Sequence, residues 1–198
     1  MISNYKTKKF EIITFSILLL LPIFIDSYYL DNISYFMCWT FISLGLAVIW
    51  GMGGILSFGQ TAFFGLAGYG FSVISINFLG IAGVSIWSVV LSLIITGIFG
   101  MIVGYFLFYG GIYDVFIGIV TLAITLVLET FMQQTAGPEY AIGSARLNGF
   151  NGMQGMPTIG FESLQFGLLE GVTQYYFILL LAIIILISLY KFKQSKIG

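Results

Sequence analysis

The sequence predicts an all-α fold, a polytopic transmembrane helix bundle of about six spans that forms a single domain over residues 1–198. The chain is 59% hydrophobic and only 8% charged, whereas a soluble domain carries about 25% charged residues. No charged residue lies between Asp31 and Asp114, which leaves room for three crossings of about 20 residues each. Glycines gathered at residues 51–59 indicate that one of the helices is broken.

The composition also excludes several functions. Seven basic and eight acidic side chains give a net charge of −1, which cannot form the dense basic patch of a nucleic-acid binder. The absence of histidine excludes His-based acid–base catalysis and His-ligated metal sites. The single cysteine, Cys38, lies in an apolar run and is interpreted as a small buried hydrophobe. The chain has no phosphate-binding loop sequence with which to hydrolyse ATP. With no histidine, and no lysine deep in a span to activate a serine, we expect no catalytic residue, metal or cofactor, and a protein that is not an enzyme.

We expect spans at about residues 10–25, 33–50, 60–79, 85–108, 112–133 and 174–190. Three lysines precede the first span and three follow the last, and these are Lys6, Lys8, Lys9, Lys191, Lys193 and Lys196. The positive-inside rule then places both termini in the cytoplasm, which requires an even number of spans. The first span has no cleavage site of small residues after it, so it is interpreted as a retained anchor rather than a signal peptide.

The segment Gly51–Gly59 contains four glycines and no charge. A solvated loop would normally carry charges, and a straight helix would lose up to about 1 kcal/mol at each glycine. A broken or re-entrant helix satisfies both facts, because irregular backbone is tolerated at membrane depth where it is buried or lines a cavity. Transporters use such breaks to present backbone groups to their substrates. The alternative is a tight contact between two helices.

Small side chains recur at helical spacing in two places. The first strip consists of Gly53, Ser57, Thr61 and Gly65, and the second of Gly100 and Gly104. On a helix, each strip would let a neighbouring helix approach closely, so packing is the default interpretation. Ser57, Gln60 and Thr61 also carry groups able to hydrogen-bond a polar solute, and a solute path is the alternative.

The fifth expected span carries one polar stripe, made of Thr121, Thr125, Glu129 and Gln133. A carboxylate facing lipid is costly, so this stripe is expected to face the bundle interior or water, where it would line a solute path. Glu129 lies about two turns before Pro138, and a solvated position at the outer interface is its alternative. Asp114 begins the same span at the inner boundary, where it is solvated or caps the helix.

The segment 134–173 is too long and polar to be part of a span. It contains Glu139, Glu162 and Glu170 against one basic residue, Arg146, and with both termini inside it is an external loop. Loops of this length are often functional. We expect it either to close over a pore or meet a partner, or to be an ordinary surface connection.

Three blocks of the sequence resemble one family. Leu46–Tyr69, which reads LAVIWGMGGILSFGQTAFFGLAGY, is similar to the signature of the permeases of branched-chain amino acid ABC importers, the LivH/LivM family, and nearer to LivM. Gly111–Tyr113 with Ile119–Ala123 resembles a second family block. Thr135–Pro138 with Asn151–Pro157 resembles the outer glycine-rich block. The blocks occur in family order and extend over most of the chain.

The resemblance implies a permease subunit of a bacterial inner-membrane importer. Its partners would be a second permease subunit, two cytoplasmic ATPase subunits and a periplasmic solute-binding protein. Family substrates include leucine, isoleucine and valine, and close relatives carry urea or short amides, which is the first alternative. The family continues beyond a basic stretch like 191–198, so we expect a truncated chain or fragment. A non-transporting structural membrane subunit is therefore the second alternative.

Overall fold

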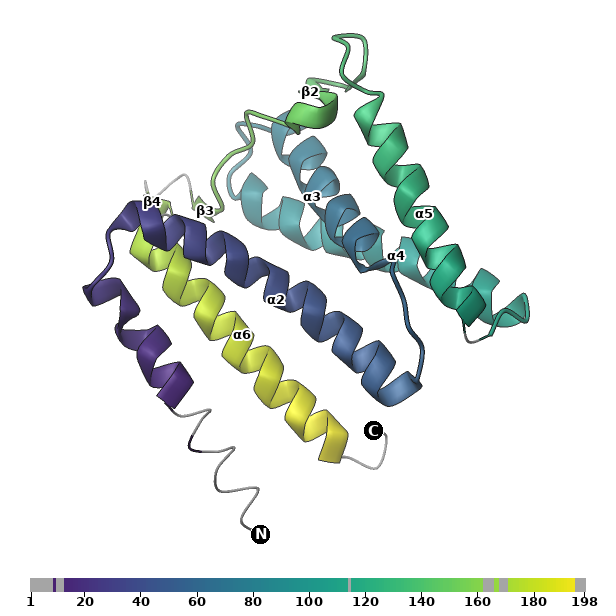
Figure 1. Ribbon diagram of the computed structural model, residues 1–198. Coiled ribbons are helices and arrows are strands. Elements are labelled where there is room, and N and C mark those ends of the chain that lie inside the picture. The colour runs from purple at the N-terminus through teal and green to yellow at the C-terminus, as the bar shows by residue number, and fades with distance from the viewer. Residues whose placement is uncertain (1–8, 10–12, 114, 162–165, 168–170, 195–198) are drawn as a thin grey trace. The chain divides into compact units, whose positions relative to one another are not determined.

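The computed structural model describes residues 9, 13–113, 115–161, 166–167 and 171–194, and the chain is a helix bundle (Figure 1). The helices are Ile13–Ile23, which ends in the 3-10 turn η1 (Leu21–Ile23), α2 (Ser27–Gly53), α3 (Gln60–Asn77), α4 (Val84–Tyr109), α5 (Val115–Gln133) and α6 (Gly171–Gln194). Between α5 and α6 lie β1 (Ala141–Ile142), β2 (Ala145–Arg146), the 3-10 turn η2 (Gly149–Asn151), β3 (Gly160–Phe161) and β4 (Phe166–Gly167). The expectation of an all-α membrane bundle is confirmed. Six of the charged residues discussed above fall outside the described residues, namely Lys6, Lys8, Asp114, Glu162, Glu170 and Lys196.

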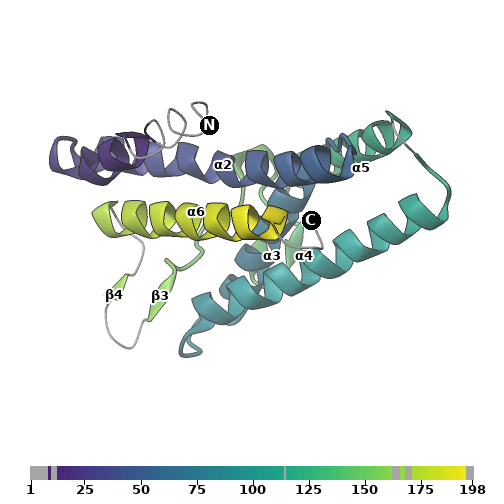
Figure 2. The ribbon, with the colours of Figure 1, turned by 90° about the horizontal axis from the view of Figure 1, so that it is seen from below.

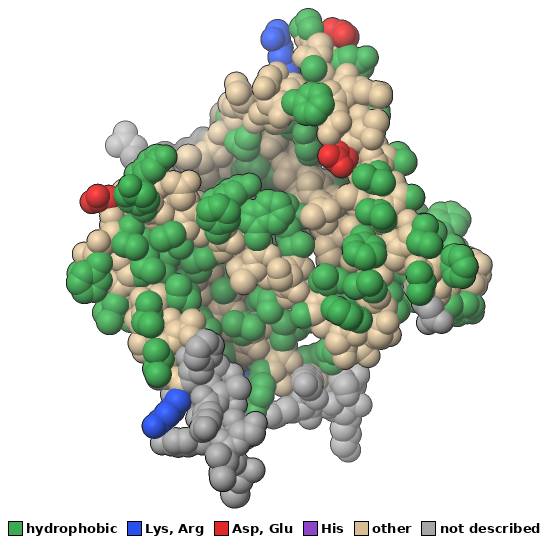
Figure 3. Space-filling model, viewed as in Figure 1, with side chains coloured by type: hydrophobic (Ala, Val, Ile, Leu, Met, Phe, Trp, Pro, Cys, Tyr) green, Lys and Arg blue, Asp and Glu red, His purple; other side chains and the backbone are tan. Residues whose placement is uncertain are grey.

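Four of the described helices are long and apolar enough to cross a membrane, namely α2, α4, α5 and α6. The spans expected at 10–25 and 60–79 correspond to the shorter helix Ile13–Ile23 and to α3, which has 18 residues. α3 is less apolar because it begins at Gln60, ends at Asn77 and carries Ser72 and Ser75. Hydrophobic side chains cover much of the face in Figure 3, and few acidic or basic groups interrupt them.

The chain divides into two compact units, and α2 runs from one into the other. The first unit comprises residues 1–40 and 169–197. There α2 lies alongside α6 (Figures 1 and 2), and the core is formed by Leu30, Tyr175 and Leu179. Side chains of the helix Ile13–Ile23 pack against this core, among them Phe15 and Leu18.

One hydrogen bond in the first unit follows directly from a proline. Pro22 has no backbone N–H, so the carbonyl of Leu18, four residues earlier, lacks its usual helical donor. The hydroxyl of Tyr175 donates to that carbonyl oxygen over 2.6 Å, and the Tyr175 side chain is fully buried. The neighbouring Tyr176 hydroxyl donates to the Leu19 carbonyl over 3.1 Å from an exposed position. The two tyrosines of α6 therefore supply hydrogen-bond donors for two backbone carbonyls near the end of the first helix.

The second unit, residues 41–168, is built on the packing of α3 against α4. The buried side chains of these two helices are mostly serines, namely Ser72 and Ser75 of α3 and Ser85, Ser88 and Ser92 of α4. The two helices lie close together at Gly70, since a Cβ atom there would lie 3.3 Å from that of Ser92. Small side chains let the two helices approach closely. The turn after α4 then leads into α5 (Figure 2).

The helix break predicted from the glycines is confirmed, with corrected bounds. Gly51 and Gly53 are helical, and the irregular backbone extends from Gly54 to Gly59. Gly54 has a φ of +68°, a left-handed conformation that glycine adopts at little cost. The single strip of Gly53, Ser57, Thr61 and Gly65 is therefore wrong, because Gly53 belongs to α2, Ser57 to the break, and the other two to α3. A period of four residues has no meaning across a break in the helix.

The segment after α5 packs on the ends of α3 and α4. Ala145, Leu147 and Met153 are buried against Tyr69 and other apolar side chains of α3. The Asn77 amide donates to the Ile142 carbonyl over 2.7 Å and accepts from the Ser144 N–H over 2.8 Å, which holds the β1–β2 hairpin. Ser85 of α4 both donates to and accepts from the backbone of Gly160 in β3, over 2.9 and 3.1 Å. These described residues thus form an ordered cap on the two helices.

Candidate functional site

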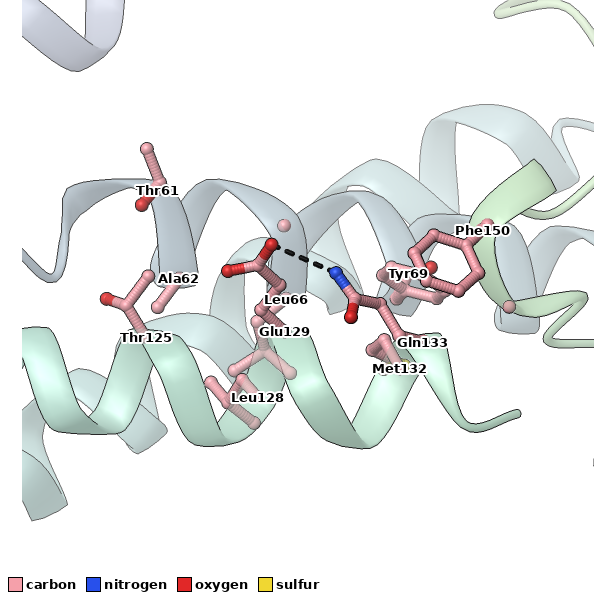
Figure 4. A pocket seen from close by; sticks show the side chains of 12 residues that line it. Thr61, Ala62, Leu66, Tyr69, Thr125, Leu128, Glu129, Met132, Gln133 and Phe150 are labelled. Carbon is pink, nitrogen blue, oxygen red and sulfur yellow. Dashed lines mark hydrogen bonds between the residues drawn. The ribbon is translucent and has the colours of Figure 1, made fainter. Parts of the chain in front are cut away.

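A pocket of about 480 Å³ lies between α3 and α5 in the second unit. Its lining residues are Thr61, Ala62, Gly65, Leu66, Tyr69, Thr125, Leu128, Glu129, Met132, Gln133, Gly149 and Phe150. Figure 4 shows that α3 forms one wall and α5 the other, and that Phe150 of η2 lies at the Gln133 end. The volume falls within the range of about 300–1,000 Å³ that is usual for small-molecule sites.

The pocket wall is mostly apolar, with its polar groups concentrated on α5. Gln133 donates from Nε2 to Oε1 of Glu129 over 3.0 Å, as expected for side chains four residues apart on one helix face. Both side chains extend from α5 toward α3 (Figure 4). Among the described residues, Glu129 is the one charged residue in the lining, so the pocket offers a carboxylate beside a large apolar surface.

The break is held against α5 by two threonines. The Phe58 N–H donates to the Thr121 hydroxyl over 3.0 Å, and the Thr125 hydroxyl donates to the Phe58 carbonyl over 3.1 Å. Backbone groups without helical partners need other partners when they are buried. These two bonds supply partners for both polar groups of Phe58, the residue at the centre of the contact.

Two glycines permit this close contact. A Cβ atom at Gly118 would lie 3.1 Å from the Leu56 carbonyl oxygen and 3.5 Å from the Phe58 ring. A Cβ atom at Gly59 would lie 3.3 Å from that of Thr121. The distances of 3.1 and 3.3 Å are shorter than ordinary van der Waals contact, so larger side chains would push the break away from α5.

A second, smaller pocket of about 230 Å³ lies beside this contact. It is lined by Gly54, Leu56, Phe58, Val115, Gly118, Ile119 and Leu122. The α5 residues that line this smaller pocket lie between Val115 and Leu122. The α5 residues that line the larger pocket lie between Thr125 and Gln133. Because a helix rises 1.5 Å per residue, the two pockets succeed each other along α5.

The structure separates the residues predicted for a solute path into two groups. Thr61, Thr125 and Glu129 line the larger pocket. Thr121 is buried against the break, Ser57 is buried and accepts from the Gly59 N–H over 3.3 Å, and Gln60 is the first residue of α3. The side-chain oxygen of Gln60 would lie 3.1 Å from a Cβ atom at Gly45, so this amide packs against α2.

The glycines predicted for helix packing also differ in their surroundings. Gly100 of α4 faces α3, since a Cβ atom there would lie 3.6 Å from the Phe63 ring. Gly65 lines the larger pocket, and among the described residues a Cβ atom there would meet nothing within 4 Å. At Gly53 and Gly104 the nearest atoms belong to Ile55 and Phe108, close neighbours in the sequence.

Sequence reasoning missed several residues that shape the site. Gly118 and Gly59 allow the break to contact α5 closely. Asn77 and Ser85 bind the backbone of the segment that contributes Phe150. Ser85, Ser88 and Ser92 stand three and four residues apart, a signal that marks a small-residue helix face. The described residues contain no group of three His, Cys, Asp or Glu side chains placed to hold a metal ion.

Comparison with known proteins gives the family. The model of one family, described as the permease component of the branched-chain amino acid transport system, matches residues 28–198. No significant match was found to a curated protein or to a solved structure. The matched region includes all of α2 to α6 apart from the first residue of α2. The chain therefore belongs to the family of permease components of branched-chain amino acid transport systems, and is a multi-pass membrane protein.

Proposed function

We propose that this chain is a membrane-spanning subunit of an ABC importer for branched-chain amino acids, and that the pocket between α3 and α5 is part of the solute path. A second permease subunit, cytoplasmic ATPase subunits and a periplasmic solute-binding protein complete the importer. Both termini lie in the cytoplasm of a bacterial cell, and the segment 134–173 faces the periplasm. The match over residues 28–198 supports the permease role, and the chemistry of the pocket supports the solute.

The observation that supports this substrate class is that one carboxylate lies beside a large apolar wall. Leu66, Leu128 and Met132 offer a surface on which an aliphatic side chain gains about 25 cal/mol for each Å² of apolar area it buries. Glu129 supplies a negative charge for an α-ammonium group, a charge-assisted hydrogen bond of the stronger kind. Urea has neither a cation nor an apolar body, so this lining favours the amino acid over urea.

The carboxylate of the solute requires hydrogen-bond donors in the same pocket. Nε2 of Gln133 uses one hydrogen toward Glu129 and carries a second. Tyr69 of α3, whose side chain carries a hydroxyl group, lies at the same end of the pocket (Figure 4). Glu129, Gln133 and Tyr69 thus place an acceptor and donors near an aliphatic surface, as a zwitterion with a branched side chain requires.

Uptake by the assembled importer in proteoliposomes tests this proposal. We expect ATP-dependent uptake of labelled leucine that isoleucine and valine compete for and urea does not. Glu129→Gln should lower the initial rate at least tenfold, because a hydrogen bond to a charged group contributes about 1.5–3 kcal/mol. Val127→Ala is the matched control, since Val127 is exposed on α5 and is absent from the pocket lining.

Two results would contradict the proposal. Competition by urea at concentrations that leave isoleucine competition unchanged would assign the pocket to small amides. Complete absence of ATP-dependent uptake, in an importer whose ATPase subunits hydrolyse ATP, would favour a structural subunit.

A further inference from the structure

We infer that Thr121 and Thr125 are positioning residues, which hold the peptide of Phe58 as a partition between the two pockets along α5. Both threonines were expected to face a solute. The structure instead directs their hydroxyl groups to the backbone of the break. The effect of the partition on transport rests on the proposed function. The attachment of Phe58 to the two threonines does not depend on that function.

The hydroxyl of Thr121 is fully used within the protein. It accepts from the Phe58 N–H, and its own hydrogen is directed to the carbonyls of Ile117 and Gly118, 2.8 and 3.0 Å away. The side chain is also buried. A hydroxyl has one hydrogen to donate, so Thr121 has none to offer a solute, and its role is to fix the break.

The hydroxyl of Thr125 completes the attachment from the next turn of the helix. Its single hydrogen is shared between the Phe58 carbonyl at 3.1 Å and the Thr121 carbonyl at 3.0 Å. Residues four apart lie on one face of α5, so the two threonines bond the N–H and the C=O of the same residue. The peptide backbone at Phe58 is thereby fixed against the helix.

The position of this attachment makes it a partition. The larger pocket begins at Thr125 and Thr61, and the smaller pocket is lined by Leu122 and by Phe58 itself. The attached peptide therefore lies at the level of α5 where the lining of one pocket ends and that of the other begins. Release of the Phe58 backbone from the two hydroxyls would open a path of continuous cavity along the helix.

Thiol labelling in the assembled importer tests the partition, with Cys38 replaced by alanine as background. Leu122→Cys places a thiol in the smaller pocket, and the reagent is a membrane-impermeant maleimide. It is added on the side from which Ser144→Cys, in the β1–β2 hairpin, is labelled. We expect Leu122→Cys to react slowly from that side. Adding Thr125→Val should raise the labelling rate about fivefold, the factor that corresponds to the loss of one hydrogen bond of about 1 kcal/mol.

Conservative variants separate positioning from simple packing. Thr125→Ser keeps the hydroxyl and should retain the slow rate, whereas Thr125→Val keeps the volume and loses the bond. Thr121→Ser should likewise retain the slow rate and folding. Thr130→Val is the matched control, because Thr130 is exposed on the same helix and belongs to neither pocket. Equal labelling rates in wild type, Thr125→Val and Thr125→Ser would overturn the inference.

The labelling result is independent of the transported solute. If leucine is not taken up but Thr125→Val still raises the labelling rate, the proposed function fails and the partition stands. If leucine is taken up and Leu122→Cys reacts as fast with the wild-type threonines as without them, the partition fails and the proposed function stands.

Discussion

The hydrogen bond from Tyr175 to the Leu18 carbonyl predicts how two helices of the first unit depend on each other. Tyr175→Phe removes only the hydroxyl, and the Leu18 oxygen then has no donor, because Pro22 cannot supply one. Pro22→Ala restores a backbone N–H at the position from which a regular helix bonds that carbonyl. The cost of losing the hydroxyl should therefore depend on whether residue 22 is proline or alanine.

The magnitude follows from the geometry of this bond. Hydrogen bonds between membrane helices contribute about 0.6 kcal/mol on average and about 1.7 kcal/mol at most. The Tyr175 bond is short, at 2.6 Å, and the side chain is fully buried. We expect Tyr175→Phe to cost about 1.5 kcal/mol in the native background and about 0.5 kcal/mol with Pro22→Ala, a coupling of about 1 kcal/mol.

Reversible unfolding in mixed micelles, followed by circular dichroism, measures the four free energies of this cycle. Tyr176→Phe is the matched control, since its hydroxyl bonds the Leu19 carbonyl over a longer 3.1 Å from an exposed position. It should cost about 0.5 kcal/mol, near the average for such bonds. Equal costs of Tyr175→Phe with proline and with alanine at position 22 would refute the reasoning.

Three further substitutions follow from the second unit. Asn77→Ala should destabilise the β1–β2 hairpin by about 1–2 kcal/mol and speed its proteolysis, because it removes bonds at 2.7 and 2.8 Å. Ser85→Ala should expose the N–H of Gly160 to faster hydrogen exchange, and an unchanged exchange rate would contradict the bond at 3.1 Å. Gly118→Ala should cost about 1–3 kcal/mol in unfolding measurements, since its Cβ would lie 3.1 Å from the Leu56 oxygen.

Much of the fold could be predicted from the sequence because the membrane constrains it. Long uncharged stretches marked the helices, and the uncharged glycines marked the break. Its bounds were less predictable, because Gly51 and Gly53 are accommodated in the last turns of α2. Helix ends tolerate glycine better than helix interiors do, so composition alone cannot locate the residue at which a helix stops.

The sequence predicted which face of α5 carries the polar side chains, but not which groups those side chains contact. The period of four residues placed Thr121, Thr125 and Glu129 on one side of α5, and the structure shows two different environments along that side. A hydroxyl binds a peptide group as readily as a solute, so the sequence could not distinguish these partners. The contact of Asn77 with the hairpin joins residues 65 positions apart. No local sequence pattern indicates a contact between residues so far apart.

Protection of the larger pocket by its solute is the most direct test of the proposed solute path. In the assembled importer with Cys38 replaced by alanine, Leu66→Cys places a thiol in the wall of that pocket, and Ser144→Cys places one in the hairpin, outside the pocket lining. We predict that saturating leucine slows maleimide labelling of Leu66→Cys at least fivefold and leaves Ser144→Cys unchanged. Equal labelling of Leu66→Cys with and without leucine, in an importer that takes leucine up, would place the solute path elsewhere.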